Sequence, residues 1–251
     1  MKIFCTDLDN TIIYSYKHDI GNDKINVEIY EDREISYITK KTYDLLNIVK
    51  KEYMIIPTTT RTIEQYKRIN LDIGEFEYAL VCNGGILLIN GERDKEWYEN
   101  SLDLIRESES ELKKAIRILE EDSRRKIEIK FIEKLFIFTK CSKPNDVIQF
   151  LKNQLNTNLV DVFNNNEKIY IIPKNLNKGT SIKRLKEKLH PKGLIAAGDS
   201  EFDISMLNEA DYGFVPNGFE FAHKISENIV EMESNKLFSD AFLEKILINY
   251  R

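Results

Sequence analysis

The sequence predicts an α/β protein in which a doubly wound parallel sheet is interrupted by an inserted α+β domain. Short apolar runs alternate with amphipathic helical segments at both ends of the 251-residue chain, a pattern typical of parallel strands covered by helices on both faces. The middle of the chain instead has strand-like runs joined by turn residues, which favours antiparallel hairpins. We therefore expect residues 1–82 and 178–251 to form a core domain, and residues 83–177 to form the inserted domain.

The core strands are expected where short apolar runs are bounded by polar or turn residues. These runs are Lys2–Cys5, Tyr53–Pro57, Tyr78–Cys82, Leu194–Ala197, Tyr212–Val215 and Asn228–Met232. Apolar residues at helical spacing lie between and after them. The helices predicted from that spacing are Ile38–Lys50, Ile63–Ile69, Thr180–Leu189, Ile204–Ala210 and Ser239–Ile248.

The segment between Tyr14 and Ile35 does not fit this alternation. It is longer than the roughly 2–6 residues usual for a strand-to-helix loop. Apolar residues alternate at Val27 and Ile29, and Gly21 lies in a group of turn residues, so the segment is expected to form a hairpin flap. Loops of this length are usually functional or disordered, and the aromatic residues here favour a function.

The inserted domain is predicted from alternating hairpins and helices. Its first hairpin turns at Asn90-Gly91, a strong hairpin signal, and a long helix is expected over Leu102–Glu121. Two further hairpins and one helix follow along the chain. They are a hairpin turning at Glu133-Lys134, a helix over Asn145–Leu155 and a hairpin around the Asn-rich turn at 164–166.

Composition excludes several classes of protein. The hydrophobic and charged fractions of 42% and 31% are those of a globular chain, and no run approaches the roughly 18 apolar residues that a membrane span needs. A net charge of −5 argues against a nucleic-acid partner, although it leaves room for a small phosphorylated one. Cys5, Cys82 and Cys141 lack metal-binding spacing, so we expect reduced thiols in a cytoplasmic protein. The sequence does not determine the oligomeric state.

Polar residues that can carry chemistry follow several of the predicted strands. Because ligands collect beyond the carboxyl ends of parallel strands, these residues are expected to converge at one edge of the sheet. Each group alone could be explained by helix capping or turn formation, whereas their joint occurrence in order favours a functional site. The candidates are Asp7 and Asp9 after the first strand, Thr59 after the second, Lys178 at the start of a helix, and Asp199 with Asp203 after Leu194–Ala197.

Three carboxylates in one small site need a cation. Asp7, Asp9 and Asp199 would repel one another if all were ionised in a shared site without a counter-charge. A few hard oxygen ligands with room left for substrate and water describe Mg2+. Such a cation would also neutralise charge on a phosphoryl group, so the sequence predicts a magnesium-dependent phosphoryl-transfer site.

The four segments together resemble the haloacid dehalogenase (HAD) superfamily of phosphohydrolases. The segments are "DLDNT" from Asp7, "TTTR" from Thr58, "NKG" from Asn177 and "GDSEFD" from Gly198. The insert lies where the type-two cap of that superfamily sits, and its composition is similar to the sugar-phosphatase-like subclass. The resemblance implies a Rossmann-like doubly wound core with an inserted α+β cap domain.

The resemblance also implies a role for each candidate residue, taken in chain order. Asp7 is the nucleophile and a metal ligand, and Asp9 transfers a proton while offering its backbone carbonyl to the metal. Thr59 binds the phosphoryl group through its hydroxyl, and Lys178 pairs with that group and with Asp7. Asp199 is a metal ligand, and Asp203 lies in or just behind the coordination shell.

The sequence departs from the superfamily pattern at two positions and leaves one neighbouring residue open. Thr60 stands where relatives usually have Gly, and Phe202 where they usually have Asn. Arg61 either contacts the substrate or faces solvent at a helix start. None of these residues belongs to the four that carry the core chemistry, Asp7, Asp9, Lys178 and Asp199.

The expected function is that of a Mg2+-dependent phosphatase acting on a small phosphorylated metabolite, with a sugar phosphate favoured. The inserted domain would then act as a lid that prefers small phosphates to phosphoproteins. Three alternatives remain open at this stage. They are a phosphomutase, a phospho-accepting signalling domain and a non-catalytic binder.

Overall fold

The structure is a computed structural model that describes residues 1–249, and it divides into two compact units. Unit 1 comprises Met1–Asp94 and the chain from Lys178 onward, and unit 2 comprises Lys95–Asn177. The later boundary lies where the sequence placed it. The earlier one lies after Asp94 instead of after Cys82, because the strand that follows Cys82 pairs with the strand that precedes it.

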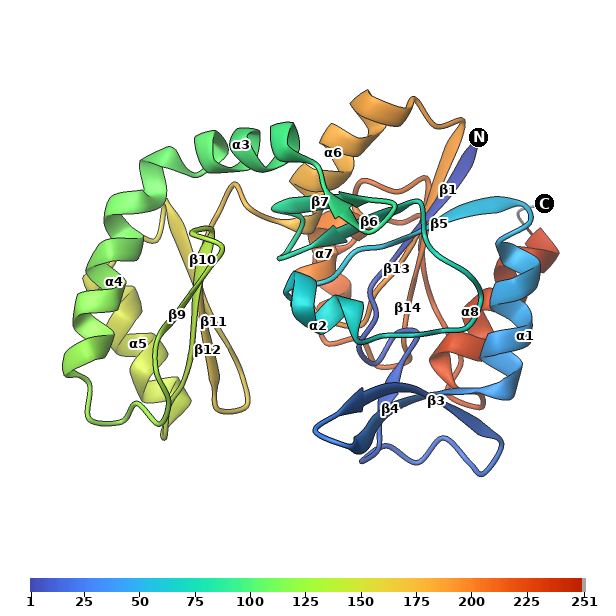
Figure 1. Cartoon of the computed structure of the whole chain (residues 1–251), viewed down its shortest axis with the longest axis horizontal. Coiled ribbons are helices and arrows are strands. Elements are labelled where there is room, and N and C mark those ends of the chain that lie inside the picture. Colours follow the sequence, from blue (N-terminus) through green and yellow to red (C-terminus); the bar gives the residue numbers. More distant parts are fainter. Residues whose placement is uncertain (250–251) are drawn as a thin grey trace. The chain divides into compact units, whose positions relative to one another are not determined.

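Unit 1 is built around a five-stranded parallel sheet, which confirms the predicted fold class (Figure 1). In the sheet Thr6, the last residue of the first strand, lies opposite both Pro57 and Ala197. Three strands therefore end at the same level. The strand order is β15 (Ile229–Glu231), β14 (Tyr212–Val215), β13 (Gly193–Ala197), β1 (Lys2–Thr6) and β5 (Tyr53–Pro57).

Helices cover this sheet, with α1 (Lys40–Val49) and α8 (Phe238–Asn249) packed together beside it and α6 (Lys178–Leu189) and α7 (Ile204–Leu207) on the opposite side (Figure 1). Phe242 of α8 contacts the rings of Phe4 and Phe214, whose strands lie in the sheet. This aromatic contact belongs to an apolar core of the unit. Across residues 1–249, no helix combines the length and the apolar character that crossing a bilayer requires.

The strand predicted at Tyr78–Cys82 forms, but it belongs to a different sheet. As β6 (Tyr78–Val81) it pairs antiparallel with β7 (Ile86–Ile89), which pairs in turn with β8 (Glu92–Arg93). Its link to the parallel sheet is an isolated bridge between Leu80 and Thr58. The hairpin turn at Asn90-Gly91 is confirmed, and both residues have the positive φ that such a tight turn requires.

The flap predicted between Tyr14 and Ile35 is confirmed as a small antiparallel sheet of β2 (Tyr14–Ser15), β4 (Arg33–Thr39) and β3 (Lys24–Tyr30). Its alternation differs from the expected one. The β3–β4 register shifts around Glu28, so Val27 and Glu28 are both buried while Ile29 is 58% exposed. A bulge that redirects a side chain in this way is a recurrent device near functional sites.

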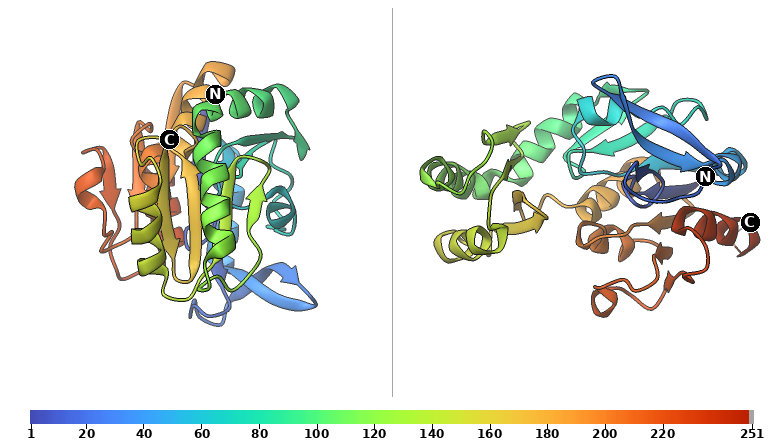
Figure 2. Two further views of the ribbon diagram at one scale, coloured as in Figure 1. Left: turned by 90° about the vertical axis from the view of Figure 1, so that its left-hand side faces the viewer. Right: turned by 90° about the horizontal axis from the view of Figure 1, so that it is seen from below.

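Unit 2 is a four-stranded antiparallel sheet with α4 (Glu109–Glu121) and α5 (Pro144–Gln154) side by side on one face (Figure 1 and Figure 2). The helix predicted at Leu102–Glu121 is interrupted. Buried Ile105 has non-helical dihedrals, and the Ser108 hydroxyl donates to the Leu159 carbonyl, so α3 (Lys95–Leu104) and η1 (Arg106–Ser108) precede α4. The strand order is β11 (Val160–Asn165), β12 (Lys168–Pro173), β10 (Phe136–Lys140) and β9 (Lys130–Ile132).

The remaining short elements of unit 1 lie near the sheet edge that carries the candidate residues. They are α2 (Ile63–Lys67), which follows the "TTTR" segment, and η2 (Glu201–Asp203), which leads into α7. One further short element, η3 (Ala222–Lys224), lies in the connection from β14 to β15.

Candidate active site

The parallel register brings the candidate segments to one edge of the sheet. The Asp7 backbone N–H donates to the Ala197 carbonyl at 2.9 Å, and the Thr58 N–H donates to the Thr6 carbonyl at 2.8 Å. Sheet hydrogen bonding therefore continues one residue beyond the strands on both sides of β1. The carboxyl ends of three neighbouring strands, where a parallel sheet binds its ligands, are held together at this edge.

A buried lysine lies among the acidic residues of this edge. The Lys178 ammonium Nζ is 2.6 Å from Oδ1 of Asp7 and 2.5 Å from Oδ1 of Asp203, and its side chain is only 1% exposed. One carboxylate oxygen from each of Asp7, Asp199 and Asp203 lies within 4.8 Å of the others. Three acidic groups thus share one buried cation, which leaves the cluster rich in negative charge.

This crowding raises the pKa values of two carboxyls. Burial raises the pKa of Asp7 well above its usual value, and Asp203 and Asp199 raise it further although Lys178 opposes the shift. Burial and the charge of Asp203 raise the pKa of Asp199 to about 7. Burial alone would lower the pKa of Lys178, but Asp203 and Asp7 raise it above its usual value. The site therefore favours a bound proton or a further cation.

Asp203 braces the loop that carries Asp199. Its Oδ2 accepts hydrogen bonds from the backbone N–H of Asp199 at 3.1 Å and of Ser200 at 3.0 Å, and from the Ser200 hydroxyl at 2.9 Å. A Cβ on Gly198 would lie 2.3 Å from Cβ of Asp203, so only glycine permits this approach. Both oxygens of Asp203 are therefore occupied by Lys178 and by this loop.

Lys178 is positioned by the start of α6. The next residue, Gly179, donates its backbone N–H to the Ser205 hydroxyl at 3.0 Å, and a Cβ there would lie 2.4 Å from the Ser205 carbonyl oxygen. Glycine thus lets α6 approach α7 closely, which places the first residue of α6 in the buried cluster.

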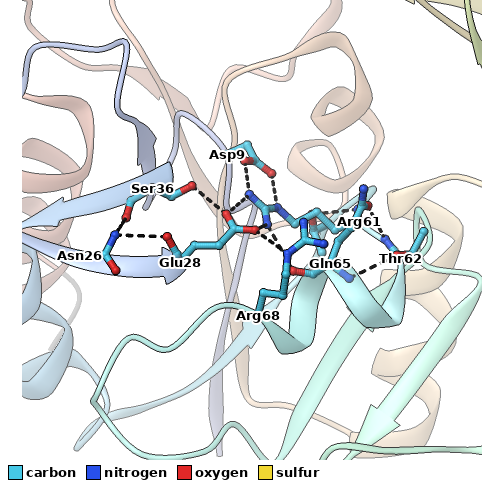
Figure 3. A network of polar contacts seen from close by, with 9 residues as sticks. Asp9, Asn26, Glu28, Ser36, Arg61, Thr62, Gln65 and Arg68 are labelled. Atoms are coloured by element: carbon cyan, nitrogen blue, oxygen red, sulfur yellow. Dashed lines mark hydrogen bonds and ion pairs between the residues drawn. The ribbon is translucent and has the colours of Figure 1, made fainter. Parts of the chain in front are cut away.

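Arg61 connects Thr59 with Asp9. Thr59 is fully buried, and its hydroxyl accepts a hydrogen bond from the Arg61 backbone N–H at 3.2 Å. The Arg61 guanidinium grips Asp9, with Nε 2.7 Å from Oδ2 and Nη2 2.7 Å from Oδ1 (Figure 3). Contacts therefore join Asp7, Lys178, Asp199 and Asp203 in one cluster, while Asp9 and Thr59 are joined through Arg61.

Two residues of the site were not assigned from the sequence. Arg61 was left between substrate contact and solvent exposure, whereas its side chain is 12% exposed and is held by Asp9 and Glu28. Glu28 was missed because simple strand alternation turns it toward solvent. The signal that could have found it is a charged residue between Val27 and Ile29 in a flap long enough to contain a bulge.

The buried lysine and the three carboxylates lie at the carboxyl edge of the parallel sheet, where enzymes of the α/β class bind their ligands. Residues 88–236 match the family model of the haloacid dehalogenase-like hydrolases. The phosphoglycolate phosphatase of Sulfurisphaera tokodaii is 30% identical over 225 residues, which cover 86% of this chain and 89% of that protein. The chain belongs to the haloacid dehalogenase-like hydrolase family and is a phosphatase, as the resemblance implied.

Solved structures support the same fold. The sucrose-phosphatase of Synechocystis sp. PCC6803, solved with sucrose and phosphate, has a TM-score of 0.68 at 16% identity, covering 98% of this chain and 96% of that one. A haloacid dehalogenase-like hydrolase from B. subtilis has a TM-score of 0.61 at 13% identity, covering 99% and 100%. At these identities the likeness establishes the fold.

Proposed function

We propose that this phosphatase is Mg2+-dependent and hydrolyses a small phosphorylated metabolite, foremost a sugar phosphate, through a phosphoryl group carried on Asp7. The observation that carries the proposal is the contact of Lys178 with Asp7 at 2.6 Å inside a buried acidic cluster. A carboxylate at a strand end next to a fixed cation can act as a nucleophile toward an electrophilic phosphorus.

The donor atoms at the cluster fit Mg2+. Asp7 and Asp199 offer carboxylate oxygens that lie close together, and hard oxygen donors are what this cation prefers. Burial and the charge of Asp203 raise the pKa of Asp199 to about 7, and a cation beside this carboxyl would favour its ionised form. In our assignment Asp7 and Asp199 hold the ion together with the Asp9 backbone carbonyl, and Asp203 stands directly behind them. When bound, the ion would neutralise charge on the phosphoryl oxygens.

The reaction divides into two balanced steps. In the first, a carboxylate oxygen of Asp7 attacks phosphorus, the bond from phosphorus to the ester oxygen breaks, and Asp9 gives a proton to that oxygen. In the second, water attacks phosphorus, Asp9 takes up the proton of that water, and the bond from phosphorus to Asp7 breaks. Inorganic phosphate leaves, and both carboxyl groups return to their initial states.

Lys178 and Thr59 complete the proposed site. Lys178 carries a full positive charge in the cluster, which stabilises the negative phosphoryl oxygens in the transition state. Thr59 offers a buried hydroxyl at the same sheet edge, which can donate to one of those oxygens. Neither residue needs to change its protonation state during turnover.

The substrate class is inferred from relatives and from architecture. The named relatives act on phosphoglycolate and on a sucrose phosphate, both small phosphate esters. Unit 2 is inserted between the segment containing Thr59 and the one beginning at Lys178, and an inserted unit at such a position can limit access to small molecules. We therefore place phosphorylated sugars first and small phosphorylated acids second.

The test is a phosphate-release screen over a panel of sugar phosphates, small phosphorylated acids and phosphopeptides, with Mg2+ and with a chelator. We expect release from small esters only when Mg2+ is present, and none from the Asp7→Asn variant. Full activity in chelator would refute the metal assignment. Turnover that required a bisphosphate activator would identify a phosphomutase instead.

A further inference from the structure

Glu28 carries a negative charge in a part of the flap where a charge is costly. Its residue is 1% exposed, so its carboxylate is stabilised by partners and not by water. Oε1 accepts from Arg61 Nη1 at 2.8 Å and Arg68 Nε at 3.1 Å, and Oε2 accepts from Arg61 Nη2 at 3.0 Å and the Ser36 hydroxyl at 2.7 Å (Figure 3). Burial opposes ionisation, but the bonds from Arg61, Ser36 and Arg68 hold the pKa of Glu28 below its usual value.

The Arg61 guanidinium uses every one of its donors. Nε and one hydrogen of Nη2 bind Asp9, the other hydrogen of Nη2 and one of Nη1 bind Glu28, and Nη1 also reaches the Gln65 carbonyl at 3.3 Å. A guanidinium has five N–H donors in a rigid planar fork. Fixing the edge that faces Glu28 therefore fixes the direction of the edge that faces Asp9.

The two carboxylates differ in how firmly they are held. The Glu28 side chain is fully buried, whereas the Asp9 side chain is 51% exposed. Arginine loses rotamer entropy when it is immobilised, and a half-exposed partner such as Asp9 is a weak anchor. The buried partner must then supply most of the immobilisation.

From this geometry we infer that Glu28 is a positioning residue for catalysis: it locks Arg61 in one orientation, and Arg61 in turn aims the Asp9 carboxyl group at the ester oxygen of the substrate. The inference rests on the proposed role of Asp9 in proton transfer. It also gives the flap a function, because the bulge in β3 is what turns Glu28 inward toward Arg61. Loss of the lock would leave Asp9 chemically intact and poorly aimed.

The consequence depends on the leaving group. A leaving oxygen that already accommodates negative charge gains little from a donated proton, whereas a more basic one depends on it. p-Nitrophenyl phosphate and phenyl phosphate differ in this respect and are close in shape. The ratio of their kcat/KM values therefore reports the aim of Asp9 and does not depend on how much of a preparation is correctly folded.

The experiment compares Glu28→Gln with Glu34→Gln on these two substrates. Glu34 lies in the same hairpin, is exposed and accepts a hydrogen bond from the Tyr37 hydroxyl, so it is a matched control whose bond goes to Tyr37 and not to Arg61. We expect Glu28→Gln to reduce kcat/KM for phenyl phosphate about tenfold more than for p-nitrophenyl phosphate, mainly in kcat. Ser36→Ala, which removes one bond to Glu28, should act in the same direction with a smaller effect.

An equal loss on both substrates, or a change no larger than that of Glu34→Gln, would overturn the inference. Asp9→Asn separates this outcome from a failure of the proposed mechanism. If Asp9→Asn itself leaves the substrate ratio unchanged, the proton-transfer role of Asp9 is wrong. If it changes the ratio, Glu28→Gln added to Asp9→Asn should change it no further.

Discussion

Asp7 sits between a buried ammonium and two other acidic groups, so its charge and its reactivity are set by its neighbours. Changing it to asparagine keeps its shape and removes the proposed nucleophile. We expect Asp7→Asn to lower kcat by at least about 1,000-fold. The fold should persist, because Lys178 keeps Asp203 as a partner at 2.5 Å.

The measurement is phosphate release by the purified variant, with its thermal unfolding followed in parallel. Asp32→Asn is a matched control, because Asp32 is exposed and has a positive φ that asparagine adopts readily. Near-normal turnover by Asp7→Asn would remove Asp7 from the nucleophilic role.

Mg2+ binding should weaken as the pH falls through 7. The pKa of Asp199 is raised to about 7 from an ordinary value of 3.8, so a proton occupies this carboxyl below pH 7 and competes with the cation. We expect the dissociation constant for Mg2+ to rise about five- to tenfold between pH 7 and pH 6. Titration calorimetry at pH 6, 7 and 8 checks this, and an affinity constant over that range would contradict it.

The raised pKa of Asp199 also makes the stability of the cation-free protein depend on pH. Because the folded pKa lies above the unfolded one, the folded protein binds more protons than the unfolded chain between about pH 4 and pH 7. The contribution of Asp199 to stability therefore falls as the pH rises through this window. Mg2+ should reverse that loss by binding the ionised form.

The candidate residues that follow the ends of strands could be identified from the sequence, whereas Glu28, which lies in the flap, could not. Asp7 and Asp199 are brought together by parallel strands that end at one level, which sequence order and apolar runs foretell, and Lys178 joins them from the start of α6. Glu28 depends on a register shift in β3 that no local residue preference encodes. The site assignments themselves remain proposals that the variants above test.

The close contact between α6 and α7 gives a prediction at the level of elements. A Cβ on Gly179 would lie 2.4 Å from the Ser205 carbonyl oxygen, so Gly179→Ala must push the helices apart. We expect a loss of roughly 1–3 kcal/mol in the free energy of unfolding, with lower activity because Lys178 moves with α6. Helix propensity alone would instead stabilise the variant by up to about 1 kcal/mol.

Urea denaturation measures this effect, and Gly193→Ala provides the comparison. Gly193 lacks a positive φ, and a Cβ there would meet only Asp211 Oδ2 at 3.7 Å, an ordinary contact. Gly193→Ala should therefore be tolerated. A Gly179→Ala variant as stable as the native chain would show that α6 can shift without cost.

Secondary structure was predictable from the sequence where apolar periodicity decides it, and less so where tertiary contacts do. The central strands and the hairpin at Asn90-Gly91 follow local signals. The interruption between α3 and α4 does not, because it depends on burying Ile105 and on a bond from Ser108 to Leu159, far along the chain. β6 likewise does not join the parallel sheet but pairs with β7, the strand that follows it in the chain.

Every residue proposed for catalysis belongs to unit 1, which gives a prediction for the whole molecule. Asp94 pairs with Lys188 of α6 at 3.1 Å, and Lys178 starts the same helix, so the two ends of the insertion are about 15 Å apart along α6. A linker of about six residues can replace Lys95–Asn177. The shortened protein should bind Mg2+ and cleave p-nitrophenyl phosphate within about tenfold of the full chain.

Discrimination between substrates should be lost in the shortened protein. If unit 2 acts as a lid, the full chain has a higher kcat/KM for sugar phosphates than for phosphopeptides. Removal of the unit should then make the two values similar. The measurement is kcat/KM for both classes in both proteins. Unchanged selectivity after the deletion would rule out unit 2 as the source of specificity.

The parallel pairing of β1 with β13 also determines how late in synthesis of the chain the first strand can pair. Lys2 pairs with Gly193, so at about 5–20 residues per second the ribosome finishes the partner of the first strand roughly 10–40 s after that strand itself. Lys178 is made somewhat sooner after Asp7, and Asp199 after about the same delay as the partner strand. A nascent or prematurely terminated chain that ends within the insertion therefore has the proposed nucleophile without its charge partner, and we expect neither the proposed cation site nor activity until the last third of the protein has been made.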